Sequence, residues 1–106
     1  MALAGSEVAL PCEDTGGDVR GWFVFVVQVP RDRDGVIARL RERGVPSKPY
    51  LPAIHLMSFY RERFGHREGE FPVCEDVAAR SIALPFFPRM SEGQVAQVAE
   101  ALLTAL

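Results

Sequence analysis

One segment of the chain gathers most of the side chains that could bind or orient a ligand. It runs from Lys48 through Tyr50 and His55 to Tyr60, and it is framed by three prolines, Pro46, Pro49 and Pro52. Proline fixes φ and removes an amide donor, so we expect a stiff connector that holds these side chains in place. Polar residues on loops with rigid support often carry function. A lone histidine is also common as an ordinary surface or core residue, so the residue types leave both interpretations of His55 open.

The charge distribution favours an anionic ligand for the same part of the chain. The net charge is −2, yet basic residues outnumber acidic ones between Arg31 and Arg67. Local positive charge of this kind could face an anion. Several of the arginines also fit the solvated face of a predicted helix. Few aromatic residues are interleaved with them, so nucleic-acid binding is not predicted.

Several other kinds of site are disfavoured by the spacing of the reactive residues. Cys12 and Cys74 form no Cys-x-x-Cys pair and have no ligand spacing with the histidines, so we predict no metal site. The first ten residues lack a basic region and do not form a secretion signal, which disfavours a disulfide and indicates the cytoplasm. The apolar runs are far short of a membrane span. The neighbouring acids Glu75 and Asp76 are explained by the start of a helix.

The elements that must position the connector are clearest before it. Residues Arg20–Val29 are β-branched, aromatic and almost continuously apolar, which predicts a strand covered on both faces or central in its sheet. Asp32–Arg43 is predicted to be a helix with Asp32 or Asp34 as its N-cap. Gly44 suits the left-handed conformation that follows a helix.

The second half of the chain predicts three helical segments and a strand. Residues 53–64 suggest one or two helical turns, with Leu56, Phe59 and Tyr60 packed inward. Pro72 is placed to start a helix whose inner face would hold Val73, Val77 and Ala78. Ser81–Leu84 is predicted to be a short strand. Ser91–Leu106 begins with a capping-box pattern that pairs Ser91 with Gln94.

The order of these elements predicts a two-layer α/β (α+β) domain, with helices packed on one face of a small sheet. Residues 1–19 are expected to be an irregular lead-in from a missing upstream domain, with a short extended piece near Ala9. Residues 20–106 are expected to form the domain itself.

The sequence resembles the C-terminal small domain of the DegT/DnrJ/StrS family of pyridoxal-phosphate-dependent sugar aminotransferases. Tyr50, His55 and Tyr60 match a Tyr-x-x-x-x-His-x-x-x-x-Tyr pattern of that family. Phe71-Pro72 with Glu75, Leu84-Pro85 and Met90 followed by Val95 match its closing motifs. The resemblance covers the chain from about Leu3 onward. It departs from the family at Met57-Ser58, where Gln-Pro is common, and at Ala53, where a proline is common.

The resemblance implies a role for each polar side chain of the connector. It implies that His55 faces the substrate with Tyr50 beside it, and that Tyr60 and Lys48 are further substrate-binding candidates. The expected substrate is a keto-sugar linked to a nucleotide. The expected partners are a large domain that binds pyridoxal phosphate and a second copy of the parent enzyme as a homodimer, with no nucleic acid and no membrane.

The resemblance also implies that a central component of catalysis lies elsewhere. Family members hold the cofactor on a lysine of their large domain, and the only lysine here is Lys48, in the connector. We therefore expect no catalytic residue, no cofactor bound by this chain alone and no transamination by it. The alternative is a stand-alone binding or assembly module that kept the fold without catalysis.

Overall fold

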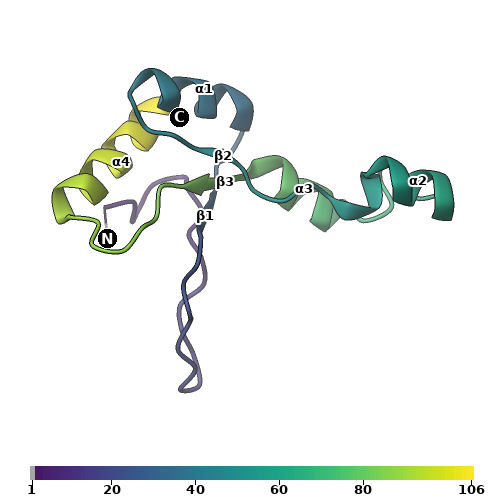
Figure 1. Cartoon of the computed structure of the whole chain (residues 1–106), viewed down its shortest axis with the longest axis horizontal. Coiled ribbons are helices and arrows are strands. Elements are labelled where there is room, and N and C mark those ends of the chain that lie inside the picture. The colour runs from purple at the N-terminus through teal and green to yellow at the C-terminus, as the bar shows by residue number, and fades with distance from the viewer. Residues whose placement is uncertain (1) are drawn as a thin grey trace.

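The computed structural model describes residues 2–106 and contains a small three-stranded antiparallel sheet with four α-helices (Figure 1). Met1, the first residue of the predicted lead-in, lies outside the described residues. The elements in chain order are β1 (Phe25–Gln28), α1 (Arg33–Glu42), β2 (Lys48–Pro49), the 3-10 helix η1 (Ile54–Leu56), α2 (Ser58–Phe64), α3 (Pro72–Arg80), β3 (Ser81–Leu84) and α4 (Glu92–Ala105). The predicted α+β class is confirmed.

Strand β3 lies in the centre of the sheet, between β1 and β2. Its residue Ile82 is opposite Val27 of β1, and both side chains are fully buried. On the other side, Ile82 is opposite Pro49. The extended piece near Ala9 adds a single bridge to Gln28 at the outer edge of β1. The first strand is therefore not central in the three-stranded sheet, which was one of the two predicted placements, although none of its four residues is exposed.

The first strand is also much shorter than the apolar run predicted. Residues 20–24 lie outside the sheet, and Trp22 and Phe23 are exposed. The partner strand sets this limit, because Leu84 pairs with Phe25 and the next residue, Pro85, has no amide hydrogen to donate. The backbone before Phe25 instead forms one side of a long projection (Figure 1).

Helices α1 and α4 pack against each other and complete the core with the sheet. Leu40 of α1 and Leu102 of α4 are fully buried in it. Helix α4 begins with the predicted capping box, in which the Gln94 amide donates to Ser91 Oγ over 3.1 Å and the Ser91 amide donates to Gln94 Oε1 over 2.9 Å. Gly44 follows α1 with the predicted positive φ of 76°. Asp32 precedes α1 but accepts no capping hydrogen bond, and it pairs with Arg39 instead.

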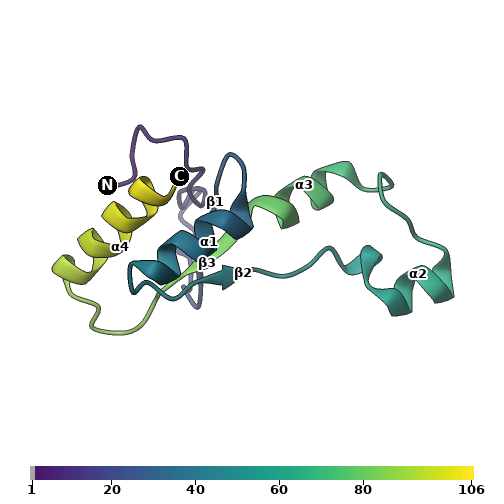
Figure 2. The same ribbon diagram turned by 90° about the horizontal axis from the view of Figure 1, so that it is seen from above.

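Helices α2 and α3 extend away from this core. We call η1, α2, the loop 65–71 and α3 together the helical arm, residues 54–80 (Figure 2). Phe59 of α2 and Val73 of α3 are exposed, so the predicted inward packing of these residues was wrong. The apolar spacing of the two helices predicts an inner face, but the arm does not reach the core against which that face would pack. The turn that ends α2 has Gly65 at φ 72°.

Candidate functional site

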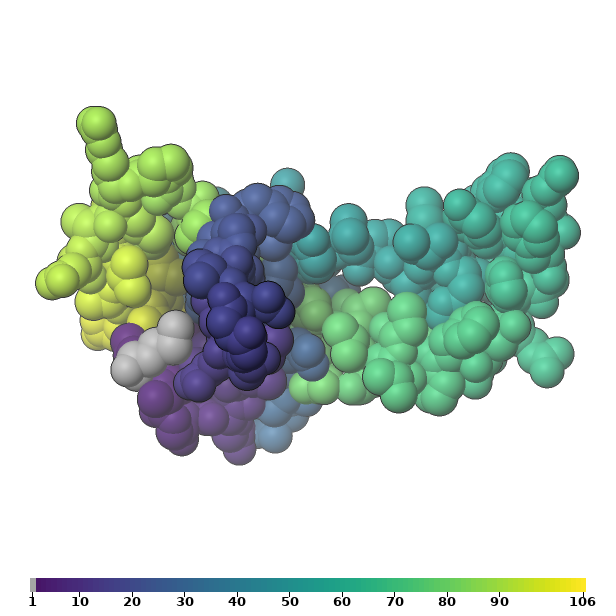
Figure 3. All heavy atoms as spheres, turned by 90° about the horizontal axis from the view of Figure 1, so that it is seen from below, coloured from purple at the N-terminus to yellow at the C-terminus, as the bar shows by residue number. Residues whose placement is uncertain are grey.

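A cavity of about 570 Å³ lies where the connector passes α3 and the start of α1. Most of its lining is apolar and comes from the connector and from η1, with Ala78 and Ala79 on the opposite wall. The polar lining groups are Arg33, Tyr50 and Glu75. In the space-filling view a gap separates the teal connector from the green α3 next to the core (Figure 3). A mostly apolar hollow with a few polar groups is a common form of ligand site.

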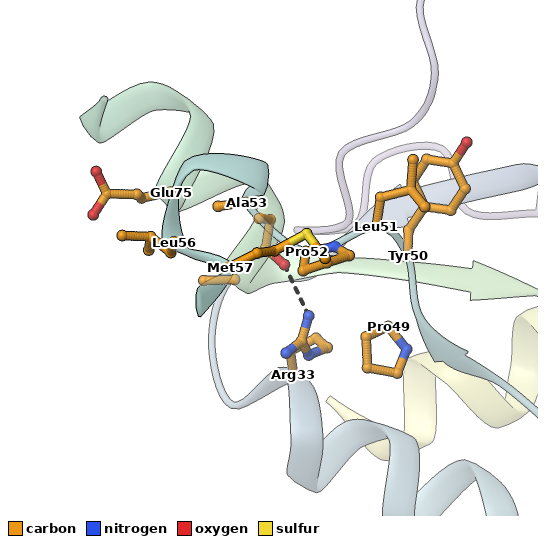
Figure 4. A pocket seen from close by; sticks show the side chains of 11 residues that line it. Arg33, Pro49, Tyr50, Leu51, Pro52, Ala53, Leu56, Met57 and Glu75 are labelled. Carbon is orange, nitrogen blue, oxygen red and sulfur yellow. Dashed lines mark hydrogen bonds between the residues drawn. The ribbon is translucent and has the colours of Figure 1, made fainter. Parts of the chain in front are cut away.

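The prolines of the connector give the cavity its shape. Pro49 ends β2, where it pairs with Ile82, and the chain then runs through Tyr50, Leu51 and Pro52 without helix or strand. The connector is thus non-helical, as predicted. Figure 4 shows Tyr50 and Glu75 at opposite ends of the lining. Tyr50 is half-buried and also lines a second hollow beside Trp22, so its ring stands between two surface depressions.

Arg33 fixes the floor of the cavity to the core. Its Nη1 donates to the carbonyl oxygen of Ala78 over 2.8 Å and lies 3.4 Å from that of Ser81 (Figure 4). Its Nε donates to Asp34. These bonds join the start of α1 to the end of α3. The guanidinium therefore has a structural role, and its engaged donors are not free for an anion.

His55 does not line this cavity. Its side chain is only 8% exposed and packs against the arm, edge-on to Phe71 with ring centroids 4.9 Å apart. Its Nε2 lies 3.3 Å from Glu75 Oε2, without the alignment of a hydrogen bond. The ring of His66 lies 6.3 Å from that of His55 and 6.0 Å from that of Phe71, and its Nδ1 lies 3.0 Å from Glu70. The rings of His55, His66 and Phe71 thus form a triangle, and each histidine has a glutamate beside it.

The carboxylates of this cluster are held in their charged forms. The Gly69 and Phe71 amides, which donate to Glu75 over 2.8 and 3.0 Å, lower the pKa of its carboxyl below the usual range, and His55 adds to the effect. The pKa of Glu70 is lowered first by its bond to His66. Burial opposes both shifts. Within residues 2–106, no group of three or more such side chains is arranged to hold a metal ion.

Tyr60 and Lys48 lie apart from both features. Tyr60 is on α2, where its ring packs between those of Phe59 and Phe64. Lys48 is exposed on β2 and lines a separate, mainly apolar hollow with Phe23 and Phe86. Apart from Lys48, the only polar side chain in the lining of that hollow is Ser47, and the lining has no carboxylate to pair with the ring nitrogen of pyridoxal phosphate. The residues around this lysine therefore do not fit the cofactor.

The structure thus distributes the four predicted residues over separate places and adds two that were not predicted. Arg33 gave no signal in the sequence, because its partners are backbone carbonyls distant in the chain. Glu75 was predicted as an acid at a helix start and as part of a family motif, but not as a residue of the site. The amides that it binds belong to a loop whose conformation could not be derived from residue types.

Comparison with known proteins gives consistent results. Residues 2–103 match the model of the DegT/DnrJ/EryC1/StrS aminotransferase family. The spore coat polysaccharide biosynthesis protein SpsC of Bacillus subtilis is 30% identical over 87 residues, which are 76% of this chain and 22% of that protein. The chain thus spans about a quarter of the length of such relatives.

Solved structures share the fold. DesV of S. venezuelae has a TM-score of 0.79 and 29% identity, covering 97% of this chain and 28% of that one. Spr1654 of Streptococcus pneumoniae, described in PMP, PLP and apo forms, has a TM-score of 0.82 at 18% identity, covering 98% of this chain and 27% of that one. No helix within residues 2–106 has both the length and the apolar character needed to cross a membrane.

Proposed function

The chain belongs to the DegT/DnrJ/EryC1/StrS aminotransferase family, and from this premise we propose that it is the C-terminal, substrate-side domain of a sugar aminotransferase acting on nucleotide-linked keto-sugars. The observation that carries the proposal is the cavity between the connector and α3, which has a shaped apolar wall but no lysine in its lining. Such a surface can bind and orient a substrate. It cannot by itself transfer an amino group.

The cofactor and the lysine that holds it would belong to a large partner domain. Pyridoxal phosphate, bound there, supplies the electron sink that amino-group transfer requires. This chain would contribute the wall that excludes water and fixes the sugar. We further propose that the parent enzyme is a cytoplasmic homodimer. The span of about a quarter of the relatives' length supports a separate large domain.

Among the four candidate residues, the geometry favours Tyr50 for direct contact with substrate. It lines the cavity and keeps part of its ring accessible. His55 would act from behind the wall, because the neighbouring Ala53 and Leu56 line the cavity while its own ring is buried. Tyr60 and Lys48 would need a partner surface to bring them near the same ligand. We therefore rank them after Tyr50 and His55.

A chimaera tests the proposal directly. The segment of B. subtilis SpsC that matches this chain is replaced by residues 2–106, and amino transfer to a nucleotide keto-sugar is followed with glutamate as donor. We expect activity from the chimaera and none from the isolated chain, with or without added pyridoxal phosphate. Turnover by the isolated chain would refute the proposed division of labour. A stoichiometric lysine adduct lost in Lys48→Ala would do the same.

Within that chimaera, the cavity residues give the sharper readout. Tyr50→Phe removes only a hydroxyl, and we expect a raised KM for the sugar with the KM for glutamate unchanged. Tyr60→Phe is the matched control on α2. Equal effects of the two substitutions would remove the reason for placing substrate in this cavity.

The alternative function is a stand-alone binding or assembly module. Finding a stand-alone gene whose product binds no nucleotide sugar would support that alternative.

A further inference from the structure

One carboxylate connects three segments of the helical arm. Glu75 lies in the first turn of α3, and its Oε1 accepts the Gly69 amide over 2.8 Å. Its Oε2 accepts the Phe71 amide over 3.0 Å and lies 3.3 Å from Nε2 of His55 in η1. The same side chain belongs to the lining of the cavity. It therefore links the cavity, the loop 65–71 and the buried imidazole.

His55 needs a partner of this kind. Its Nε2 is one of two fully buried side-chain polar atoms that lack a hydrogen-bond partner among the described residues. A buried polar atom without compensation is costly, and the nearby charge of Glu75 offsets that cost. The ring is held on its other sides by Phe71 and by His66, whose ring centroid is 6.3 Å away. Without Glu75, the imidazole would be confined by packing but not oriented.

The position of α2 depends on these contacts. Helix α2 packs chiefly on η1 and lies beyond the end of the sheet (Figure 2). The loop 65–71 connects it to α3, and the two Glu75 hydrogen bonds to that loop shape the return. Arg33 thus fixes α3 to α1, whereas Glu75 connects α3 to η1, which carries Leu56 of the cavity wall.

We infer that Glu75 is a positioning residue, which orients His55 and the loop 65–71 so that the cavity wall formed by η1 keeps its place. The consequence for catalysis rests on the proposed function, because only then does the wall meet a sugar. The positioning itself does not, since it involves only contacts within this chain. An experiment can therefore disprove the positioning role of Glu75 without disproving the proposed function, and the reverse.

The neighbouring acid shows that Glu75 does more than sit at a helix start. Asp76 is the next residue of α3, but it is exposed and pairs with Arg80 at 2.8 Å within its own helix. Glu75 lies in the first turn, where the helix dipole favours a carboxylate. Only Glu75 also receives amides from another segment. Asp76→Asn is thus a matched control for Glu75→Gln.

The experiment follows the carboxyl groups and amides of the 106-residue chain by NMR. In Glu75→Gln we expect hydrogen exchange at Gly69 and Phe71 to accelerate on the order of tenfold. Exchange in β3 should stay unchanged, which shows that the core is intact. Asp76→Asn should leave both loop amides protected. Equal acceleration in the two variants, or none in Glu75→Gln, would overturn the inference.

A pair of histidine variants tests the contact with His55 and needs neither cofactor nor sugar. His55→Phe should raise the pKa of Glu75 towards its usual range while leaving it below, because the two amides remain. His66→Phe should raise the pKa of Glu70 and leave that of Glu75 unchanged. If His55→Phe leaves the pKa of Glu75 unchanged, Glu75 only caps the loop and does not orient His55. A reversed pattern, with Glu75 responding to His66 alone, would also exclude the positioning of His55.

Discussion

The core and the helical arm are stabilised by different kinds of interaction, although one chain of ordinary composition forms both. In the core, side chains such as Ile82 and Leu102 are removed from water by the sheet and the two packed helices. In the arm, Phe59 and Phe64 are largely exposed, and order comes from particular contacts at Glu75 and His55. The core is therefore held by apolar burial, whereas the arm is held by a few polar contacts and by partly exposed aromatic rings. A surface held in this way is well suited to meet a partner or a ligand.

The strongest test of this contrast compares two leucines. Leu40 is fully buried in the core, so Leu40→Ala should lower the free energy of unfolding by about 2–5 kcal/mol. Leu51 is 62% exposed beside the cavity, and Leu51→Ala should change the free energy of unfolding by less than about 0.5 kcal/mol. Urea unfolding followed by circular dichroism measures both. Similar losses would show that the connector contributes to the same core.

The next largest effect is expected at the joint between the two regions. Arg33→Met keeps an apolar stem but removes the donors that reach the carbonyl groups of Ala78 and Ser81. We expect a loss of about 1–3 kcal/mol, typical of hydrogen bonds from a charged group. Arg41→Met is the control on the same helix, because Arg41 is exposed. If thermal unfolding responds equally to both substitutions, the joint is not held by Arg33.

Much of the core could be predicted from the sequence because its signals are local. The capping box at Ser91, the glycine after α1 and the apolar strand after α3 each follow from a few adjacent residues. The length of β1 could not, since it is limited by Pro85, which directly follows a partner strand distant in the chain. A sequence pattern shows that a residue is apolar, but it does not show whether a core lies within reach.

Only part of the candidate site could be predicted from the sequence, for the same reason. The prolines correctly predicted a non-helical connector, and the family resemblance drew attention to Tyr50 and His55. The resemblance did not show that His55 is buried behind the wall, because its surroundings come from the loop 65–71 and α3. Glu75 was visible as an acid near a proline. Its hydrogen bonds to Gly69 and Phe71 require a loop conformation that no residue type specifies.

Substitutions at the first residues of the helices should have a smaller effect on stability, and this effect should again differ between the core and the arm. Helix α4 has a side-chain cap, whereas α2 begins after Met57 without one. Ser91→Ala should cost about 1 kcal/mol of global stability. Met57→Ser should instead add helix protection in α2 without changing the unfolding midpoint. Hydrogen exchange resolved by residue measures both, and a midpoint shift with Met57→Ser would show that α2 folds together with the core.

The smallest effect on the whole molecule is expected from acid, and it should be confined to the arm. The folded pKa values of Glu70 and Glu75 lie below the unfolded value of about 4.3, so their contribution to stability is fully present above that pH. It is lost as the pH falls through the folded values, when both carboxylates take up protons and release their partners. Amide protection in the loop 65–71 should then disappear, while β3 stays protected. Glu68→Gln, an exposed neighbour, should not move this transition. Simultaneous loss in the loop and in β3 would mean that the arm and the core unfold as one unit.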